Sequence, residues 1–332
     1  MIHLTLNDEA GARPRRLPFF LAMEEWAAAQ LPADEYFFTW SVEPTVIIGR
    51  NQDLETEVDR EYCAARGIEI VRRRSGGGCV YADRDNLMLS YVSPRIDVLG
   101  TFADYTARVC KALAALGIDA VVSGRNDITV GGKKVSGTAF YHLPGRSIVH
   151  GTMLYDTDFE NMMKAITPSR AKLESNMVKS VESRITTLRS LLPGLTLEEL
   201  NTALIRNITD SSLVLDNRAV SEIEQIEQRY YRHEWIERRQ TSPTVRIKGV
   251  GDIALTPRCN EDGSIDSFEI GGDAFVLKDT SELVNRVRGA KKDADALARR
   301  LEETDVSDFI AGLTNATFID LLLKPKETET IS

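Results

Sequence analysis

The chain has 332 residues, 42% of them hydrophobic, and a formal net charge of −9. This length is ample for a buried core and favours two domains. The negative charge argues against nucleic-acid binding as the main role, because such binding depends on neutralising phosphates. With no apolar run long enough to cross a bilayer and no signal-peptide pattern, a cytoplasmic protein without a membrane partner is expected.

Zinc sites and disulfides find little support in the sequence. The cysteines at 63, 79, 110 and 259 are widely spaced and form no C-x-x-C pair, so neither a zinc site nor a secreted disulfide framework is indicated. His233-Glu234 lacks the second histidine of H-E-x-x-H, which excludes a zincin.

The first predicted element is an amphipathic helix over residues 17–31, in which Phe19, Met23 and Trp26 follow helical spacing. Further along, Thr196 with Glu199 forms a possible capping box. Such a pair opens a helix because the two side chains cap each other's backbone N–H groups. Ser221 with Glu224 has the same spacing and predicts another helix start.

A glycine-rich loop is the first candidate site. Three arginines, a serine and three consecutive glycines stand between predicted strands at residues 68–71 and 79–92. This arrangement predicts a hairpin, whereas Rossmann and Walker loops run from a strand into a helix. Bare glycine backbone can approach an anion, although a flexible hairpin tip is the alternative. Arg72 and Arg74 would share a strand face suited to phosphate or carboxylate, with Arg73 solvated on the other.

A second candidate site follows a helix predicted over residues 102–116. Lys133 and Lys134 come directly after Gly131-Gly132, which predicts a strand, a tight turn and a strand. A lysine there would place positive charge on an α-phosphate or a reacting carboxylate, and we expect the other lysine to be solvated. Asp127 is a candidate Mg²⁺ ligand, since that ion takes one or two carboxylates plus phosphate oxygens. Capping a turn is its alternative role.

Beyond Ser242-Pro243 the pattern changes. Strands are predicted over residues 245–255 and 265–277, separated by a turn at residues 260–263. The remainder is expected to be helical up to the polar tail after Lys324.

Taken together, these motifs resemble the lipoate-protein ligase family. The matching pieces, in order, are residues 46–52, 67–68, 72–81, 83, 86, 126–128, 134–139 and 150–152. The resemblance implies an α+β fold: a mixed-sheet catalytic domain over residues 1–243, as in biotin ligases and class II aminoacyl-tRNA synthetases, and a small α+β accessory domain over residues 244–332.

The resemblance also implies a two-step reaction. Lipoate and ATP, with Mg²⁺, would form lipoyl-AMP and pyrophosphate. A lysine of an acceptor lipoyl domain would then take the lipoyl group and release AMP. The implied acceptors are the acyltransferase subunits of 2-oxoacid dehydrogenases and the glycine cleavage H protein.

Site residues follow from the same resemblance. Lys134, which directly precedes Val-Ser-Gly, would be the catalytic residue, bridging the lipoate carboxylate and the α-phosphate. Asn86 would support the glycine-rich loop. The other residues implied to bind ATP or lipoyl-AMP are Arg72, Ser75, Gly76, Gly77, Gly78, Cys79, Val80, Ser136, Gly137, Ala139, His150 and Gly151.

Three positions depart from the family pattern: Cys79 stands where a small residue such as Ala is usual, Ala82 replaces His, and Asp85 replaces Gly. One alternative function is therefore an ATP-independent octanoyltransferase that acts through a thioester at Cys79. We favour the interpretation that Cys79 packs as a small apolar residue. The other alternative is a non-catalytic protein that binds lipoyl domains or lipoate. The sequence does not distinguish lipoate from octanoate or biotin as the acid.

Overall fold

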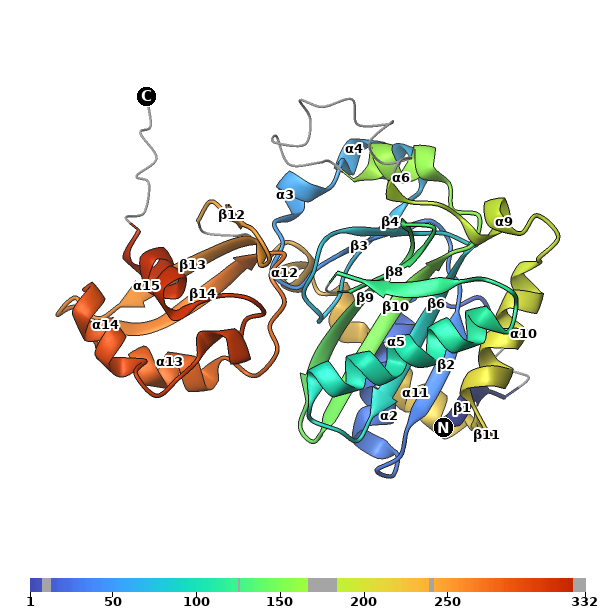
Figure 1. Cartoon of the computed structure of the whole chain (residues 1–332), viewed down its shortest axis with the longest axis horizontal. Coiled ribbons are helices and arrows are strands. Elements are labelled where there is room, and N and C mark those ends of the chain that lie inside the picture. Colours follow the sequence, from blue (N-terminus) through green and yellow to red (C-terminus); the bar gives the residue numbers. More distant parts are fainter. Residues whose placement is uncertain (8–12, 125, 167–183, 239–241, 325–332) are drawn as a thin grey trace. The chain divides into compact units, whose positions relative to one another are not determined.

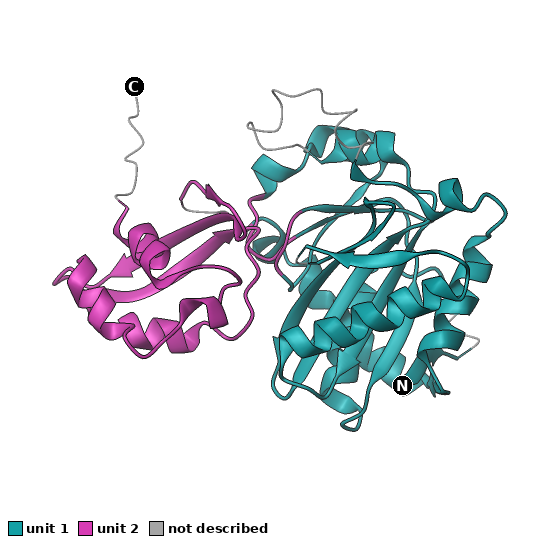
Figure 2. Ribbon diagram, viewed as in Figure 1, with its two compact units in different colours: residues 1–48, 54–75, 79–237 teal, residues 49–53, 76–78, 238–332 magenta. Residues whose placement is uncertain are grey.

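The structure is a computed structural model, and it describes the chain except for residues 8–12, 125, 167–183, 239–241 and 325–332. The predicted tail after Lys324 lies outside the described residues. The chain forms two compact units (Figure 2). Unit 1 holds residues 1–48, 54–75 and 79–237, and unit 2 holds residues 49–53, 76–78 and 238–332. Among the described helices, none has both the length and the apolar character needed to span a membrane.

Unit 1 is built on an eight-stranded mixed sheet (Figure 1). β1 pairs in parallel with both of its neighbours, and the other pairings in this sheet are antiparallel. The spatial order is β11 (Ser211–Leu215), β1 (Ile2–Leu6), β2 (Tyr36–Trp40), β6 (Asn86–Ser93), β10 (Arg146–Leu154), β9 (Lys133–Leu143), β8 (Asp127–Val130) and β7 (Ala120–Ser123). With the helices that pack on it, this sheet confirms the predicted α+β class.

Helices cover both faces of the sheet (Figure 1). α2 (Leu17–Gln30) and α11 (Asn217–Glu227) pack on one face, and α5 (Val98–Ala114) and α10 (Leu197–Ile208) pack on the other. Every residue of β6 and β10 is buried, as expected for central strands that are covered on both sides. Polar side chains on these two strands are therefore shielded from solvent.

α2 confirms the helix predicted near the N-terminus, but the prediction that this helix is amphipathic is wrong, because it lies inside the fold. Apart from Phe20, all residues from Leu17 to Ala28 are buried, including Glu24 and Glu25. A helix buried nearly all round is enclosed by protein. Because burying an unpaired carboxylate is costly, these two side chains need partners within the core.

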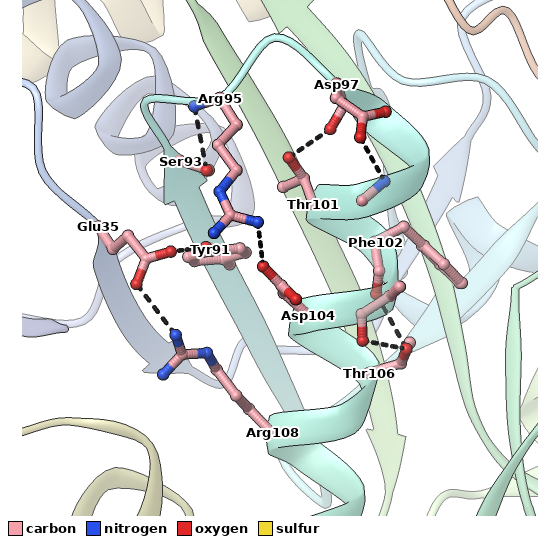
Figure 3. A network of polar contacts seen from close by, with 12 residues as sticks. Glu35, Tyr91, Ser93, Arg95, Asp97, Thr101, Phe102, Asp104, Thr106 and Arg108 are labelled. Carbon is pink, nitrogen blue, oxygen red and sulfur yellow. Dashed lines mark hydrogen bonds and ion pairs between the residues drawn. The ribbon is translucent and has the colours of Figure 1, made fainter.

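α5 begins earlier than the prediction of residues 102–116. It starts after Asp97, whose side chain accepts a hydrogen bond from the backbone N–H of Gly100 at 3.2 Å (Figure 3). Asp is among the preferred N-cap residues because its carboxylate accepts from such N–H groups. The predicted start followed apolar spacing alone and missed this cap.

The carboxylate of Glu35, which directly precedes β2, connects β6 to α5 (Figure 3). Glu35 accepts a hydrogen bond from the Tyr91 hydroxyl at 2.5 Å with one oxygen and binds Arg108 at 3.1 Å with the other. Tyr91 lies on β6 and Arg108 on α5, so Glu35 links the sheet to the helix.

The glycine-rich loop is not a hairpin loop. β4 (Glu69–Arg72) precedes it and β5 (Val80–Ala82) follows it, but both pair with β3 (Thr45–Ile48), in the order β4-β3-β5. The hairpin prediction is therefore wrong, because β3 lies between the two strands. The second predicted hairpin is confirmed: β8 and β9 pair directly around Gly131 and Gly132, both of which have positive φ.

One of the two predicted capping boxes is present. Thr196 and Glu199 cap each other's backbone N–H groups at the start of α10. The second prediction is wrong, since Ser221 lies inside α11, which begins after the N-cap Asp216. Further short helices of unit 1 are α3 (Leu54–Glu57), α4 (Arg60–Arg66), α6 (Phe159–Ala165), α9 (Leu188–Leu191), η1 (Gln228–Tyr231) and α12 (His233–Ile236).

Unit 2 contains an antiparallel sheet with its own helices. The strand predicted over residues 245–255 is divided in two, because positive φ at Gly249 and Gly251 turns the chain back on itself. The elements are β12 (Val245–Ile247), β13 (Gly251–Cys259), β14 (Ile265–Gly272), α13 (Ser281–Val287), α14 (Ala294–Arg300), η2 (Val306–Asp308) and α15 (Asn315–Leu323). They enclose an apolar core that includes the edge-to-face pair Phe268–Phe318. The predicted division into residues 1–243 and 244–332 stays a prediction, since each unit combines separate stretches of sequence.

Candidate active site

Lys134 lies at the start of β9 and forms an ion pair with Asp127 at the start of β8. The distance from Lys134 Nζ to Asp127 Oδ1 is 2.7 Å, and both side chains are about one-third exposed, at 34% each. Lys133 is exposed. The pairing fixes the ammonium group beside the strands while solvent still reaches it.

Gly137 gives the Lys134 side chain its space. A Cβ at Gly137 would lie 2.7 Å from Lys134 Nζ and 2.8 Å from Cε. Residues three apart on a regular strand face opposite sides, but the β8–β9 pairing shifts register between Ile128 and Thr129. Such a bulge re-aims side chains, so the ammonium lies over the Gly137 backbone.

Arg72 anchors the end of β4. Its guanidinium donates from Nε to the Trp235 carbonyl at 2.9 Å and from Nη2 to the Ile236 carbonyl at 2.8 Å. The Trp235 indole returns a hydrogen bond to the Arg72 carbonyl at 2.9 Å. Arg72 is fully buried, so the strand end is tied to α12.

Arg73 is not solvated, and that prediction is wrong. Its side chain is 4% exposed and donates from Nε to Ser75 Oγ at 2.9 Å and from Nη1 to the Ile47 carbonyl at 3.0 Å. Burial lowers the pKa of Arg73 to about 10, which still leaves it charged at neutral pH. Arg74 pairs with the buried carboxylate of Glu25 on α2.

Ser75 and His150 meet on the face of the sheet covered by α2. Ser75 Oγ lies 2.7 Å from His150 Nε2, and His150 Nδ1 lies 3.0 Å from both carboxylate oxygens of Glu24. Glu24 also accepts hydrogen bonds from the hydroxyls of Ser90, at 2.6 Å, and Tyr141, at 3.2 Å. We call Glu24, His150 and Ser75 the buried polar chain.

The β9–β10 pairing brings this chain close to Lys134. Ala139 is opposite His150 in the register, and Gly137 is opposite Thr152. Residues two apart on a strand share a face and lie about 7 Å apart. His150 therefore lies on the same sheet face as the Lys134 ammonium, one step along the strands.

Gly151 and Ser136 point to the opposite face, toward α5. A Cβ at Gly151 would lie 2.9 Å from the Tyr105 hydroxyl and 3.1 Å from the Gly137 carbonyl oxygen, so this position has room only for glycine. Ser136 is fully buried, and its hydroxyl has no hydrogen-bond partner among the described residues.

Asn86 supports the turn between β5 and β6. Its side-chain amide donates to the Tyr81 carbonyl at 3.0 Å, and its oxygen accepts from the Thr157 hydroxyl. Val80 lies in β5, paired with Ile47. Cys79 precedes β5 and is half-buried. Burial, reinforced by the nearby Glu57 carboxylate, raises the pKa of the Cys79 thiol to about 12.

The three glycines of the loop, at positions 76–78, belong to unit 2, whereas Ser75 before them and Cys79 after them belong to unit 1. Gly77 has a φ of +86°, which side chains rarely allow. Within unit 2, a Cβ at Gly76 would lie 3.0 Å from the Ala274 carbonyl oxygen.

No group of three or more His, Cys, Asp or Glu side chains that could hold a metal ion occurs among the described residues. Asp127 offers a single carboxylate. That donor set fits Mg²⁺ only if phosphate oxygens complete the coordination, which is how this ion is commonly bound.

The sequence prediction missed Glu24 and Glu25. Their signal was present as two adjacent carboxylates inside an otherwise apolar helical stretch. Charged residues are seldom fully buried unless they are paired, so such a stretch indicates polar partners in the core.

Most of the chain is similar to known proteins. The lipoyl protein ligase A/B catalytic domain matches residues 18–209, and the bacterial lipoate protein ligase C-terminus matches residues 244–322. The chain is similar to lipoate-protein ligase LplJ of Bacillus subtilis (strain 168), with 33% identity over 318 residues that cover 91% of this chain and 95% of the relative.

Solved structures agree with this relationship. A lipoate-protein ligase A bound with ATP shares 25% identity and a TM-score of 0.61, covering 71% of this chain and 98% of that one. A bi-partite lipoate protein ligase from Thermoplasma acidophilum, described together with its E2 lipoyl domain, shares 25% identity and a TM-score of 0.64, covering 71% of this chain and 95% of that one.

Proposed function

The chain belongs to the lipoate-protein ligase family, and on that premise we propose that it activates lipoate with ATP and transfers the lipoyl group to a lysine of an acceptor lipoyl domain. Acyltransferase subunits of 2-oxoacid dehydrogenases and the glycine cleavage H protein are the proposed acceptors. The family name and the ATP-bound and lipoyl-domain neighbours support this proposal.

The observation that carries the proposal is the Lys134 ammonium, fixed by Asp127 over the bare backbone of Gly137. A carboxylate and a polyphosphate repel each other, so their reaction needs a cation at the point of contact. A preorganised charge stabilises the transition state because it requires no reorganisation during the reaction. Lys134 is the described cation best placed for this role.

In the first step, a lipoate carboxylate oxygen attacks the α-phosphorus of ATP, and the bond to pyrophosphate breaks. In the second, the acceptor lysine attacks the acyl carbon, and AMP leaves. Positioning contributes most of the rate in such a scheme, and no protein nucleophile is required. Exclusion of water would protect lipoyl-AMP between the steps.

The proposed ligand contacts are those of the sequence prediction, with two refinements from the geometry. Arg72 donates to the carbonyls of Trp235 and Ile236, so it would act by anchoring the start of the loop. Ser75 and His150 would act together, because they are hydrogen-bonded to each other.

Asp127 would hold Mg²⁺ together with oxygens of the nucleotide. When bound, the ion would neutralise charge on the phosphates. Asp127 also holds Lys134 at 2.7 Å, so the same carboxylate would orient both positive groups.

A thioester route through Cys79 is disfavoured by its environment. The thiolate is the nucleophilic form, and a pKa of about 12 leaves almost none of it at neutral pH. A protein that only binds lipoate could also use the Lys134 ammonium to hold the carboxylate, so turnover with ATP is what distinguishes a ligase from a binder.

The test is mass spectrometry of a lipoyl domain incubated with the enzyme and lipoate, octanoate or biotin, with and without ATP. We expect a mass gain equal to one lipoyl group, only with ATP, and the same gain from Cys79→Ala. Acyl transfer without ATP that is lost in Cys79→Ala would establish the octanoyltransferase instead. Ligand binding without any mass gain would favour the binder.

A further inference from the structure

The buried polar chain contains a carboxylate that the reaction above does not use. Glu24 is fully buried on α2, and both of its oxygens contact His150 Nδ1 at 3.0 Å. Its other contacts are neutral hydroxyls, Ser90 and Tyr141. Among the described residues that contact it, His150 alone can supply a compensating positive charge.

The hydrogen bonds that Ser75 can still donate or accept determine what the buried polar chain can bind. A hydroxyl donates once and accepts twice. Arg73 Nε already occupies one acceptor position of Ser75 at 2.9 Å. If His150 is neutral with its proton on Nδ1, toward Glu24, then Nε2 accepts the Ser75 proton. Ser75 then has no donor left for an anion.

A protonated His150 reverses this result. Both ring nitrogens then donate, Nδ1 to Glu24 and Nε2 to Ser75. The two acceptor positions of Ser75, which is fully buried, are filled by Arg73 and His150, and its proton no longer has a partner within the buried polar chain. An anion beside Ser75 and a proton on His150 therefore favour each other.

Charges around His150 determine which state prevails. Arg73, behind Ser75, opposes a second positive charge, whereas Glu24 favours it because a buried carboxylate is stabilised by a cationic partner. The Tyr141 ring lies 5.9 Å from the imidazole, and burial raises the Tyr141 pKa well above its usual value, so this phenol is neutral. Arg74, over the Tyr141 ring, is paired with Glu25.

We propose that Glu24 is a positioning residue that lets His150 take up a proton when the acid substrate binds, so that Ser75 donates a hydrogen bond to the carboxylate or its adenylate. This inference rests on the proposed function for the identity of the acid. The ligand class is an acyl anion, and Glu24 acts on it only through His150 and Ser75.

The direct test is ¹⁵N NMR of the His150 imidazole in the full chain, assigned with His150→Asn, with and without saturating lipoate at neutral pH. We expect both ring nitrogens to carry protons in the bound state. One unprotonated nitrogen in that state would overturn the proposal. This readout needs no variant of Glu24, so it holds even if such a variant fails to fold.

Kinetics supply a second test. Glu24→Gln keeps the size and a hydrogen-bonding oxygen but removes the charge, so KM for lipoate should rise about tenfold, the usual weight of a charge-assisted hydrogen bond, with kcat much less affected. Ser75→Ala should raise KM for lipoate by a similar factor. The double variant Glu24→Gln/Ser75→Ala should have a KM no higher than that of either single variant. Additive effects would contradict a pathway through Ser75.

Glu35→Gln is the matched control, because Glu35 is also bound to a tyrosine hydroxyl, but its side-chain partners are Tyr91 and Arg108 and not members of the buried polar chain (Figure 3). It should leave KM unchanged. An equal rise in KM would show a general loss of packing and overturn the proposal. Absence of lipoate binding to the unaltered chain would overturn the proposed function as well, whereas normal turnover with a neutral His150 overturns this inference alone.

Discussion

Lys133 and Lys134 are neighbours in sequence, yet their ammonium groups have different surroundings. Lys134 is paired with Asp127 and occupies the space left by Gly137, whereas Lys133 is exposed at the turn. An exposed charge is screened by water and salt. The local structure therefore favours Lys134 over Lys133 for the proposed chemistry.

Replacing Lys134 by Ala should lower lipoate-dependent pyrophosphate release by about 100-fold or more, the usual effect of removing a charge that stabilises the transition state. Lys133→Ala is the control and should retain normal release. Both variants should unfold at nearly the same temperature, since neither side chain is buried. Normal release from Lys134→Ala would remove Lys134 from the mechanism.

The β8–β9 hairpin shows how backbone geometry positions a side chain. Its register shift places Lys134 and Gly137 on one face, although they are three residues apart. The hairpin also carries Asp127, so charge, partner and space come from one continuous piece of chain.

Gly137→Ala tests this geometry. Its Cβ would meet the flexible end of Lys134 at 2.7 Å, and a flexible end can move, so stability should change by less than about 1 kcal/mol. Displacement of the ammonium should nevertheless reduce turnover by about 10- to 100-fold. Thermal unfolding and initial rates measure the two effects. Gly194→Ala, where a Cβ meets nothing within 4 Å, should change neither, and an unaltered rate for Gly137→Ala would contradict the role of this space.

The local elements were predictable where one short segment contains the whole signal. The β8–β9 turn and the Thr196 cap are such cases. The insertion of β3 between β4 and β5 was not, because it depends on pairing with a strand that lies more than twenty residues away in the sequence. Adjacent strands suggested a hairpin, and long-range pairing decided otherwise.

The sequence leads to the candidate site through the residues that carry motifs, and it does not reveal the residues that contact them. Arg73 was expected in solvent because strand alternation says which side a residue faces, not what covers that side. Here Ser75 and the Ile47 carbonyl cover it. Glu24 was overlooked for the same reason, since its partners come from β6, β9 and β10.

The two units have separate cores. All three tryptophans, at positions 26, 40 and 235, lie in unit 1. Tryptophan fluorescence thus reports on unit 1, whereas calorimetry reports on both units. This difference makes the cooperativity of the chain measurable without cutting it.

Phe318→Ala should destabilise unit 2 by about 3–5 kcal/mol, because it removes a fully buried aromatic side chain. We expect the calorimetric transition of unit 2 to move to lower temperature, while the fluorescence transition of unit 1 stays in place. Equal shifts in both signals would show that the chain unfolds as a single cooperative unit.

The enclosure of α2 limits where residues can be inserted into or deleted from the chain. A helix turns about 100° per residue, so deleting one residue before Glu24 would swing both carboxylates away from His150 and Arg74 and into apolar neighbours. Insertions and deletions should therefore be absent from residues 17–28 in functional variants, while the exposed turn at residues 260–263 should accept them. A scan of single-residue insertions and deletions along the chain should recover functional variants at residues 260–263 and none at residues 17–28.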